Sequence, residues 1–270
     1  MAAEIIPTLP GNPYGLGRQL NHDERSLAYA FGATEDARAA VLAVEWRRRV
    51  PVFDQGKLGS CTGNAMGGWL GTDNKLRQGL TTFTSPGYSG DLNEQAAVEI
   101  YHEATILDPY QGTYPPTDTG SDGLSVTKVA KNLGYVDTYT HILAVADVKT
   151  AVQAGPVLCG TNWYEGMFTP GSDNVVSISG ALAGGHEYLL VGYDADGSLS
   201  YPAPYKFTNS WGTGWGDNGY FYMSDATLTQ LLKSQGDATV PHAVVTIPPS
   251  GKTITQVVVT YSDGTTQTLP

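Results

Sequence analysis

The chain has 270 residues, with 15 Lys and Arg against 26 Asp and Glu, for a net charge of −11. A chain this acidic lacks the concentrated basic footprint that a phosphate backbone requires, so no nucleic-acid partner is expected. A hydrophobic content of 41% excludes a disordered chain, and two cysteines exclude a disulfide-stapled scaffold.

No window approaches 18 consecutive apolar residues, so no membrane span is expected. The N-terminus has neither a basic nor an apolar leader region, which argues against a signal peptide. We therefore expect a protein that is cytoplasmic or released without such a peptide.

The first half of the sequence predicts mostly helices. A Pro- and Gly-rich arm opens the chain, and a more helical stretch follows around Asn21–Val44. Apolar residues at helical spacing predict further helices at Cys61–Arg77, Asn93–Leu107, Ser125–Leu133 and Asp147–Ala154. The first of these carries four glycines, each costing about 1 kcal/mol relative to Ala. We retain it because buried helices use glycine for close backbone approach.

The second half predicts strands. Short β-prone runs separated by Gly, Pro and Asp turns lie at Val157–Cys159, Glu187–Tyr193, Tyr205–Asn209 and Gly219–Met223. Helices followed by strands predict an α+β fold. Near the C-terminus, Asp263-Gly264 between two β-prone runs predicts a hairpin over 253–269.

Three Gly-rich segments carry the chemistry, at 54–65, 183–194 and 207–224. They supply Cys61, His186 and Asn209. A cysteine at a helix N-terminus is biased toward thiolate by the macrodipole, and a nearby imidazole lowers its pKa further. The asparagine can accept from the imidazole and fix the ring. Gln55 can donate to an oxyanion together with the backbone N–H of Cys61.

These segments resemble the papain-like cysteine peptidases (peptidase family C1) over roughly residues 44–224. The order Cys, His, Asn matches that family, as do Gln55 and the run Asn209-Ser210-Trp211-Gly212. His186 and Asn209 follow Cys61 at close to the family's spacing of about 130–150 residues.

The resemblance implies a papain-like two-lobed fold, with a helical lobe, a β-rich lobe and the active-site cleft between them. Cys61 then begins the central helix of the helical lobe, while the β-rich lobe carries His186 and Asn209. Trp211 covers the hydrogen bond between those two residues, and substrate lies extended across the cleft. The implied activity is that of a cysteine endopeptidase acting through a thiolate–imidazolium pair and a thioester acyl-enzyme.

Two departures from the family pattern bear on source and specificity. Leu58 stands where many members have a cysteine, which removes a nearby disulfide and suggests a bacterial or phage-type branch. Glu187 stands where the family often has a small residue, in the pocket for the side chain two residues before the cut. There it would favour a basic substrate residue.

The resulting division is an N-terminal arm or short pro-like segment (1–45), a papain-like peptidase domain (46–248) and a C-terminal β-hairpin appendage (249–270). The N-terminal region is too short to match the family's helical propeptide, and it either blocks the cleft or packs on the fold. Polypeptide substrate is the expected partner; no cofactor is expected, and no Cys/His cluster has zinc spacing.

Two alternatives remain open. One is a thiol-dependent amidase or peptidoglycan hydrolase of phage or bacterial origin, in which case the protein would be phage-associated. The other is a catalytically silent binding module that keeps the fold. Host compartment and oligomeric state are not predicted.

Overall fold

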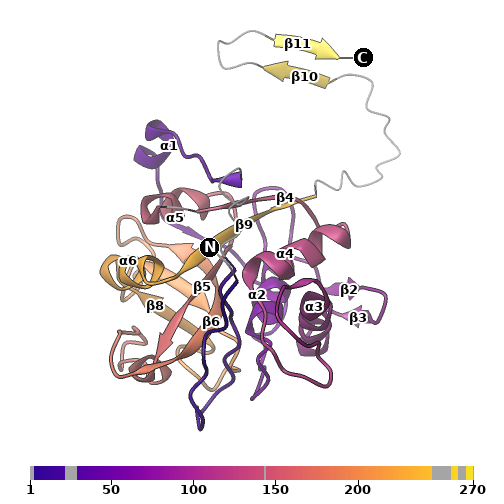
Figure 1. Cartoon of the computed structure of the whole chain (residues 1–270). Coiled ribbons are helices and arrows are strands. Elements are labelled where there is room, and N and C mark those ends of the chain that lie inside the picture. The colour runs from indigo at the N-terminus through magenta and orange to yellow at the C-terminus, as the bar shows by residue number, and fades with distance from the viewer. Residues whose placement is uncertain (1–2, 22–28, 143, 245–256, 261–265, 270) are drawn as a thin grey trace.

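The computed structural model describes residues 3–21, 29–142, 144–244, 257–260 and 266–269 (Figure 1). The helices are α1 (Glu35–Ala39), α2 (Cys61–Leu70), α3 (Glu94–Leu107), α4 (Gly123–Asn132), α5 (Val145–Ala151) and α6 (Asp225–Lys233), with a 3-10 turn at Glu165–Phe168. In Figure 1, α2, α3 and α4 gather on one side of the molecule, and α5 and α6 lie on the other.

The main sheet is antiparallel, with strand order β4-β9-β5-β6-β7-β8 and β1 paired to β6. Its strands are β1 (Val44–Glu45), β4 (Val136–His141), β5 (Val157–Tyr164), β6 (Leu182–Tyr193), β7 (Tyr205–Thr208), β8 (Tyr220–Met223) and β9 (Asp237–Ala243). A separate two-stranded sheet pairs β2 (Thr82–Thr84) with β3 (Ser89–Asp91). Helices in one lobe and an antiparallel sheet in the other confirm the expected α+β, two-lobed fold.

Local capping fixes where the central helices begin. The Asn93 side chain accepts from the backbone N–H groups of Gln95 and Ala96, which starts α3. The Asp122 side chain accepts from the Ser125 N–H in the same way at α4. Each cap satisfies donors that the first helical turn leaves unpaired.

Two helix predictions were too long. The helix predicted over Cys61–Arg77 ends at Leu70, with Gly71 at its C-cap. In the stretch around Asn21–Val44 the described helix is α1, while residues 22–28 lie outside the described part of the chain. The glycine-rich helix itself is confirmed, and its glycines serve close packing: a Cβ on Gly63 would lie 2.3 Å from the Ala97 carbonyl oxygen of α3.

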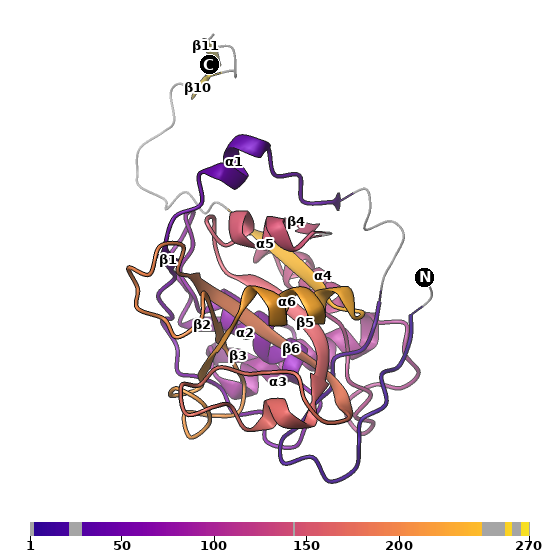
Figure 2. The same cartoon turned by 90° about the vertical axis from the view of Figure 1, so that its left-hand side faces the viewer.

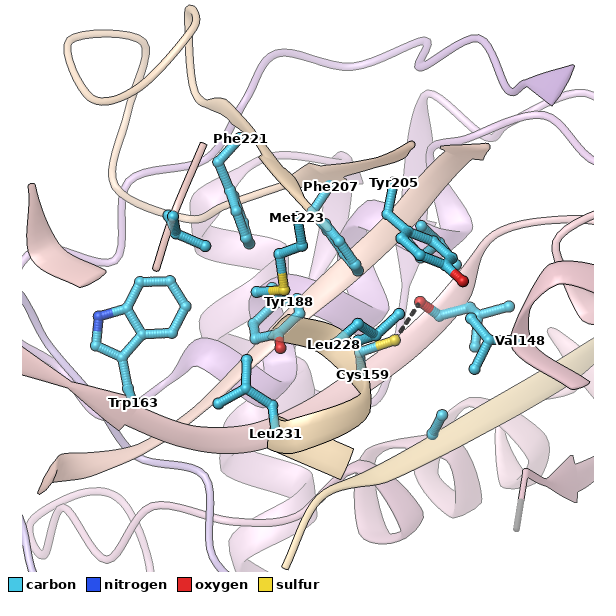
Figure 3. Packing of buried hydrophobic residues seen from close by; sticks show 14 of the residues in the cluster. Val148, Cys159, Trp163, Tyr188, Tyr205, Phe207, Phe221, Met223, Leu228 and Leu231 are labelled. Atoms are coloured by element: carbon cyan, nitrogen blue, oxygen red, sulfur yellow. Dashed lines mark hydrogen bonds between the residues drawn. The ribbon is translucent and has the colours of Figure 1, made fainter. Parts of the chain in front are cut away.

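The alternation along β6 separates two hydrophobic cores. Tyr188 and Leu190 join a cluster with Cys159 and residues of α5 and α6, shown in part in Figure 3. Leu189 and Val191 join a second cluster with α2, α3 and α4. Figure 2 shows α6 in front of β5 and β6, with α2 and α3 behind them. Because side chains alternate along a strand, neighbouring residues of β6 serve opposite faces of the sheet.

Near the C-terminus, β10 (Val257–Thr260) and β11 (Thr266–Leu269) pair antiparallel, as the predicted hairpin requires. Asp263 and Gly264, the predicted turn residues, lie outside the described residues. The division into arm, peptidase domain and appendage stays a prediction. Within the described ranges, the helices are too short or too polar to cross a bilayer.

Candidate active site

His186 is held by Asn209 and covered by Trp211. The Nε2 atom of His186 lies 2.7 Å from Oδ1 of Asn209, which follows β7 directly. Since that oxygen also accepts the Ser210 N–H at 2.8 Å, the amide orientation is fixed. The Trp211 ring stacks on the imidazole with centroids 4.6 Å apart and an 18° angle between planes. The other ring nitrogen, Nδ1, is buried and has no hydrogen-bond partner.

Cys61 is the first residue of α2, and its side chain is fully buried. Backbone N–H groups of Glu187, Gly17 and Thr62 lie close enough to its sulfur to favour the thiolate. Glu187 is the neighbour of His186 on β6, so the helix N-terminus and the histidine strand meet at the sulfur. The Nδ1 atom of His186 is the ring nitrogen that Asn209 leaves unbonded.

Gln55 is fixed on the loop before α2. Its Nε2 donates to the Leu58 carbonyl at 2.7 Å, and its Oε1 accepts from the Ser210 hydroxyl. Its own backbone N–H donates to the Ser210 carbonyl at 2.9 Å. Bonds to both lobes therefore orient the amide, whose second Nε2 hydrogen is free to donate elsewhere.

Residues 14–20, here called the cleft segment, run along the junction of the two lobes, where substrate was expected (Figure 1, indigo). Tyr14 stacks on Trp211 with centroids 4.7 Å apart. Trp211 Nε1 donates to the Gly15 carbonyl at 3.2 Å, and the Gly15 N–H donates to Gly56 at 2.9 Å. This end of the segment therefore lies over the tryptophan that covers His186.

The middle of the cleft segment bonds to both lobes. The N–H groups of Gly17 and Arg18 donate to the Gly185 carbonyl on β6 at 3.1 and 3.0 Å. On the helical side, the Ser121 N–H donates to the Gly17 carbonyl at 2.9 Å, and the Gln19 N–H donates to Ser121 at 2.7 Å. The N-terminal arm is thus part of the site in this structure.

This covering reverses the expected electrostatics. We expected the helix N-terminus and the imidazole to lower the pKa of Cys61. Burial instead raises it from 9.0 to about 12, and burial lowers the pKa of His186 from 6.5 to about 4. Desolvation penalises both charged forms, so thiol and imidazole are neutral while the segment is in place.

Glu187 is fully buried, and neither carboxylate oxygen has a hydrogen-bond partner. Burial raises its pKa well above 4.5; Asp237 raises it further and the charge of Arg18 opposes the rise. Arg18 is itself fully buried and pairs with Asp237 of β9. Sequence reasoning selected Glu187 but missed Arg18 and Asp237, which no local motif links to it.

Among the residues whose placement is described, no group of three or more His, Cys, Asp or Glu side chains could hold a metal ion. Cys159, the second cysteine, lies in β5 and is buried in the core; both cysteines are free thiols.

A protein-family model described as "Papain family cysteine protease" matches residues 29–236. The chain is 30% identical over 214 residues to the oryzain gamma chain of Oryza sativa subsp. japonica, covering 70% of this chain and 56% of that protein. It is 28% identical over 227 residues to cysteine proteinase A of Leishmania mexicana, covering 74% and 60%. The chain thus spans a little over half the length of these curated relatives.

Among solved structures, the cysteine protease xylellain from Xylella fastidiosa superposes with a TM-score of 0.64 at 19% identity. The match covers 86% of this chain and 97% of that one. At this identity the likeness concerns the fold, and it supports the two-lobed arrangement.

Proposed function

Because the chain belongs to the papain family of cysteine proteases, we propose that it is a cysteine endopeptidase whose nucleophile is Cys61. One observation carries the assignment. His186 Nε2 is held by Asn209 at 2.7 Å and its other ring nitrogen is buried without a hydrogen-bond partner, while the backbone N–H of the next residue, Glu187, lies beside the Cys61 sulfur. This leaves one imidazole nitrogen oriented and one free to move a proton.

The chemistry follows from these positions. His186 takes the thiol proton, and the sulfur of Cys61 attacks the peptide carbonyl carbon. The amide of Gln55 and the backbone N–H of Cys61 donate to the oxyanion of the tetrahedral intermediate. His186 then protonates the departing amine, and a thioester remains.

Deacylation uses the same groups. His186 removes a proton from water, the hydroxide attacks the thioester carbon, and the carbon–sulfur bond breaks. The thiolate regains the proton from His186, and the carboxylic acid product leaves. In both halves of the cycle Asn209 holds the imidazole ring of His186, and Trp211 shields the hydrogen bond between these two residues.

The test must displace the cleft segment, because the thiol is otherwise covered. A Cβ on Gly17 would lie 2.0 Å from the Gly59 carbonyl oxygen, so Gly17→Val cannot keep the segment in place. We expect the Gly17→Val protein to hydrolyse casein and Gly17→Val/Cys61→Ala to be inactive. The matched control is Gly17→Val/Cys159→Ala, which retains activity.

Casein hydrolysis by the Cys61→Ala double variant at the rate of its parent would contradict the assignment. Parallel assays on purified cell-wall peptide separate an endopeptidase from the amidase alternative. Activity on wall peptide alone would replace the endopeptidase proposal with that alternative.

We also propose a bacterial or phage-type origin within the family. Leu58 replaces the cysteine that often precedes the nucleophile, and the structural likeness to xylellain, a bacterial protein, extends over nearly all of that chain. A phylogeny of peptidase domains that grouped residues 46–248 with the plant or protozoan relatives would contradict this origin.

A further inference from the structure

We propose that Trp163 is a positioning residue for His186, whose ring it holds in the orientation that exchanges a proton with Cys61. The inference rests on the proposed peptidase function, because it concerns the histidine of the same site. The role differs from that of Trp211, which covers the hydrogen bond between His186 and Asn209. Trp163 comes from another strand and meets the imidazole at another angle.

The register of the main sheet brings Trp163 and His186 together. The strand predicted at Val157–Cys159 is longer in the structure, and the added part of β5 includes Trp163. Thr161 pairs with His186 across β5 and β6, and Trp163 pairs with Gly184. Trp163 and His186 are therefore diagonal neighbours on one face of the sheet, within reach of an aromatic side chain. Because Gly184 has no side chain, this face leaves room for the indole.

The two rings are in direct contact. The ring centroids of Trp163 and His186 are 5.0 Å apart, with an angle of 75° between the planes. Trp211 meets the same imidazole by stacking, at 4.6 Å and 18°. The two indoles are perpendicular to each other, with centroids 5.3 Å apart. The imidazole thus lies in a corner formed by two indoles, and such aromatic pairs are favourable beyond the area that they bury.

The hydrogen bond from Asn209 does not fix the ring by itself. It holds one atom of His186, Nε2, at 2.7 Å. A ring that is held at one atom can still turn about that atom, and turning displaces Nδ1, the nitrogen that the mechanism requires. Contacts with two perpendicular indoles restrict this turning. Trp163 therefore complements Asn209 in setting the direction of Nδ1.

Trp163 is itself held firmly by the sheet lobe. Its side chain is fully buried. Phe221 of β8 and Tyr188 of β6 meet it edge-on, with centroids 5.8 and 5.9 Å away, and Figure 3 shows all three side chains in the same core cluster. Because protein cores are close-packed, the indole cannot move without displacing these neighbours.

The contacts of Trp163 with β6 and β8 do not depend on the cleft segment, whereas two contacts of Trp211 do. Trp211 stacks on Tyr14 and donates to the Gly15 carbonyl, and both partners belong to the cleft segment. When that segment leaves, Trp211 loses these two contacts, while Trp163 keeps its neighbours in the sheet. Trp163 is therefore most important for the orientation of His186 in the uncovered, active site.

The indole N–H of Trp163 shows which part of the side chain acts. Within the described part of the chain, its Nε1 atom is buried and has no hydrogen-bond partner. Burying an N–H group without an acceptor is unfavourable, so this group does not explain why a tryptophan stands here. The ring contact with His186 remains as the explanation. Phenylalanine keeps a ring at this position and loses no hydrogen bond, so it is the conservative variant.

The test measures alkylation of Cys61 by iodoacetamide in the Gly17→Val protein at pH 6 and pH 9.5. A well-placed imidazole stabilises the thiolate at pH 6, whereas above the ordinary thiol pKa of 9.0 the thiol ionises without that help. We expect Trp163→Leu to lower the rate at pH 6 about tenfold and to leave the rate at pH 9.5 within about twofold. Casein hydrolysis at saturating substrate should fall by a similar factor.

Two further variants separate ring orientation from general loosening of the core. Trp163→Phe should restore the rate at pH 6 to within about threefold of the parent, because the ring contact is kept. Phe207→Leu is the matched control and should leave both rates unchanged. Phe207 is fully buried in the same cluster, but its ring stacks on Phe221. The charge of Glu187 also acts on the Cys61 thiol, but it is present in every variant and cancels in the comparison.

Three results would overturn the proposal. The first is an equal rate at pH 6 in the parent and in Trp163→Leu. The second is a loss of the same size in Phe207→Leu, and the third is an equal loss at both pH values, since each would indicate loosening of the core. Should Trp163→Leu fail to give a cooperative thermal transition, Trp163→Met replaces it in the same assay, because methionine fills irregular core space without a ring.

This proposal and the endopeptidase proposal fail in distinguishable ways. A Gly17→Val protein that hydrolyses nothing, but whose Cys61 alkylation responds to Trp163→Leu as expected, contradicts the endopeptidase and keeps the positioning role. A protein that hydrolyses casein equally fast with and without Trp163 keeps the endopeptidase and contradicts the positioning role.

Discussion

The two cysteines of the chain are both fully buried, but different parts of the molecule cover them. Cys159 lies in β5 among residues from the sheet, α5 and α6, with its thiol 3.8 Å from the Val157 carbonyl (Figure 3). Cys61 begins α2 and is covered in part by Gly17 of the cleft segment. Burial raises the pKa of both thiols.

The difference lies in what uncovering each thiol requires. Exposing Cys159 means opening a core packed with aromatic and aliphatic side chains, which is equivalent to unfolding. For Cys61 we expect that departure of residues 14–20 from the junction is enough, since Gly17 is one of the groups at its sulfur. Desolvation raises the pKa of both thiols. At Cys159 only unfolding would remove that desolvation, whereas at Cys61 we expect movement of the cleft segment to remove it.

The largest expected effect is on thiol reactivity. Displacing the segment by Gly17→Val returns Cys61 toward or below its ordinary pKa of 9.0 from about 12, and each unit is a tenfold change in thiolate fraction. We expect the rate of Cys61 alkylation by iodoacetamide at pH 7 to rise by about 10³. Cys159 should stay unmodified in both proteins. Equal alkylation rates at Cys61 in the two proteins would contradict the claim that the cleft segment controls the reactivity of this thiol.

Removing the side-chain donor near Cys61 comes next. Gln55→Ala in the Gly17→Val background should lower kcat by about 10²–10³, the typical loss for one oxyanion donor. The thermal midpoint should be followed in parallel, because Gln55 also bonds Leu58 and Ser210. A kcat within threefold of the parent in a stable protein would exclude Gln55 from the oxyanion site.

A third prediction concerns acid. Burial holds His186 neutral down to about pH 4, whereas the unfolded chain protonates it near 6.5. Between these values the unfolded state binds more protons, so stability is fully present above pH 6.5 and falls as pH drops to 4. The loss from this group is up to about 3 kcal/mol.

Comparison with His186→Gln separates the contribution of His186 to the pH dependence of stability from the contribution of the carboxylates. The free energy of unfolding should fall more steeply between pH 6.5 and 4 in the wild type than in the variant. Parallel pH profiles for the two proteins would mean that His186 is solvated, and the covered site would be refuted.

The smallest effect is expected at Cys159. Cys159→Ala should cost about 1 kcal/mol, because it removes one buried atom from a packed core. Cys159→Ser should cost more, about 1–3 kcal/mol, by burying a hydroxyl among apolar side chains. Denaturant unfolding measures both. A loss of peptidase activity when Cys159→Ala is added to Gly17→Val, at unchanged stability, would contradict its purely structural role.

The sequence predicted the parts of this comparison that short segments encode. Cys61 opening a helix is specified by local pattern, as are Gln55 and Trp211 nearby. The predicted strands Glu187–Tyr193 and Tyr205–Asn209 missed two boundaries, because β6 includes His186 and β7 ends at Thr208, just before Asn209. Helix length was less predictable. The helix that begins at Cys61 ends at Leu70, where the backbone N–H of the C-cap residue Gly71 donates to the Gly67 carbonyl, although the apolar spacing continues beyond.

Long-range pairing was not predictable from pattern. Arg18 and Asp237 are separated by 219 positions and meet only because the arm crosses the junction beside β9. The expected low pKa of Cys61 was wrong for the same reason: motifs indicate the helix N-terminus and the imidazole, but no motif indicates that residues 14–20 pack at the thiol. Glu187 was selected because it follows His186 in the chain. Arg18 and Asp237, whose charges act on the Glu187 carboxylate, were not selected.

The most direct test is mass spectrometry of the Gly17→Val protein after incubation with a general thiol-directed epoxide. We predict one adduct, mapped to Cys61, with Cys159 unmodified and much slower labelling of the wild type. Labelling of Cys159 in preference to Cys61, or none at Cys61 once the segment is displaced, would contradict the claim that residue 61 is a competent nucleophile beneath a removable cover.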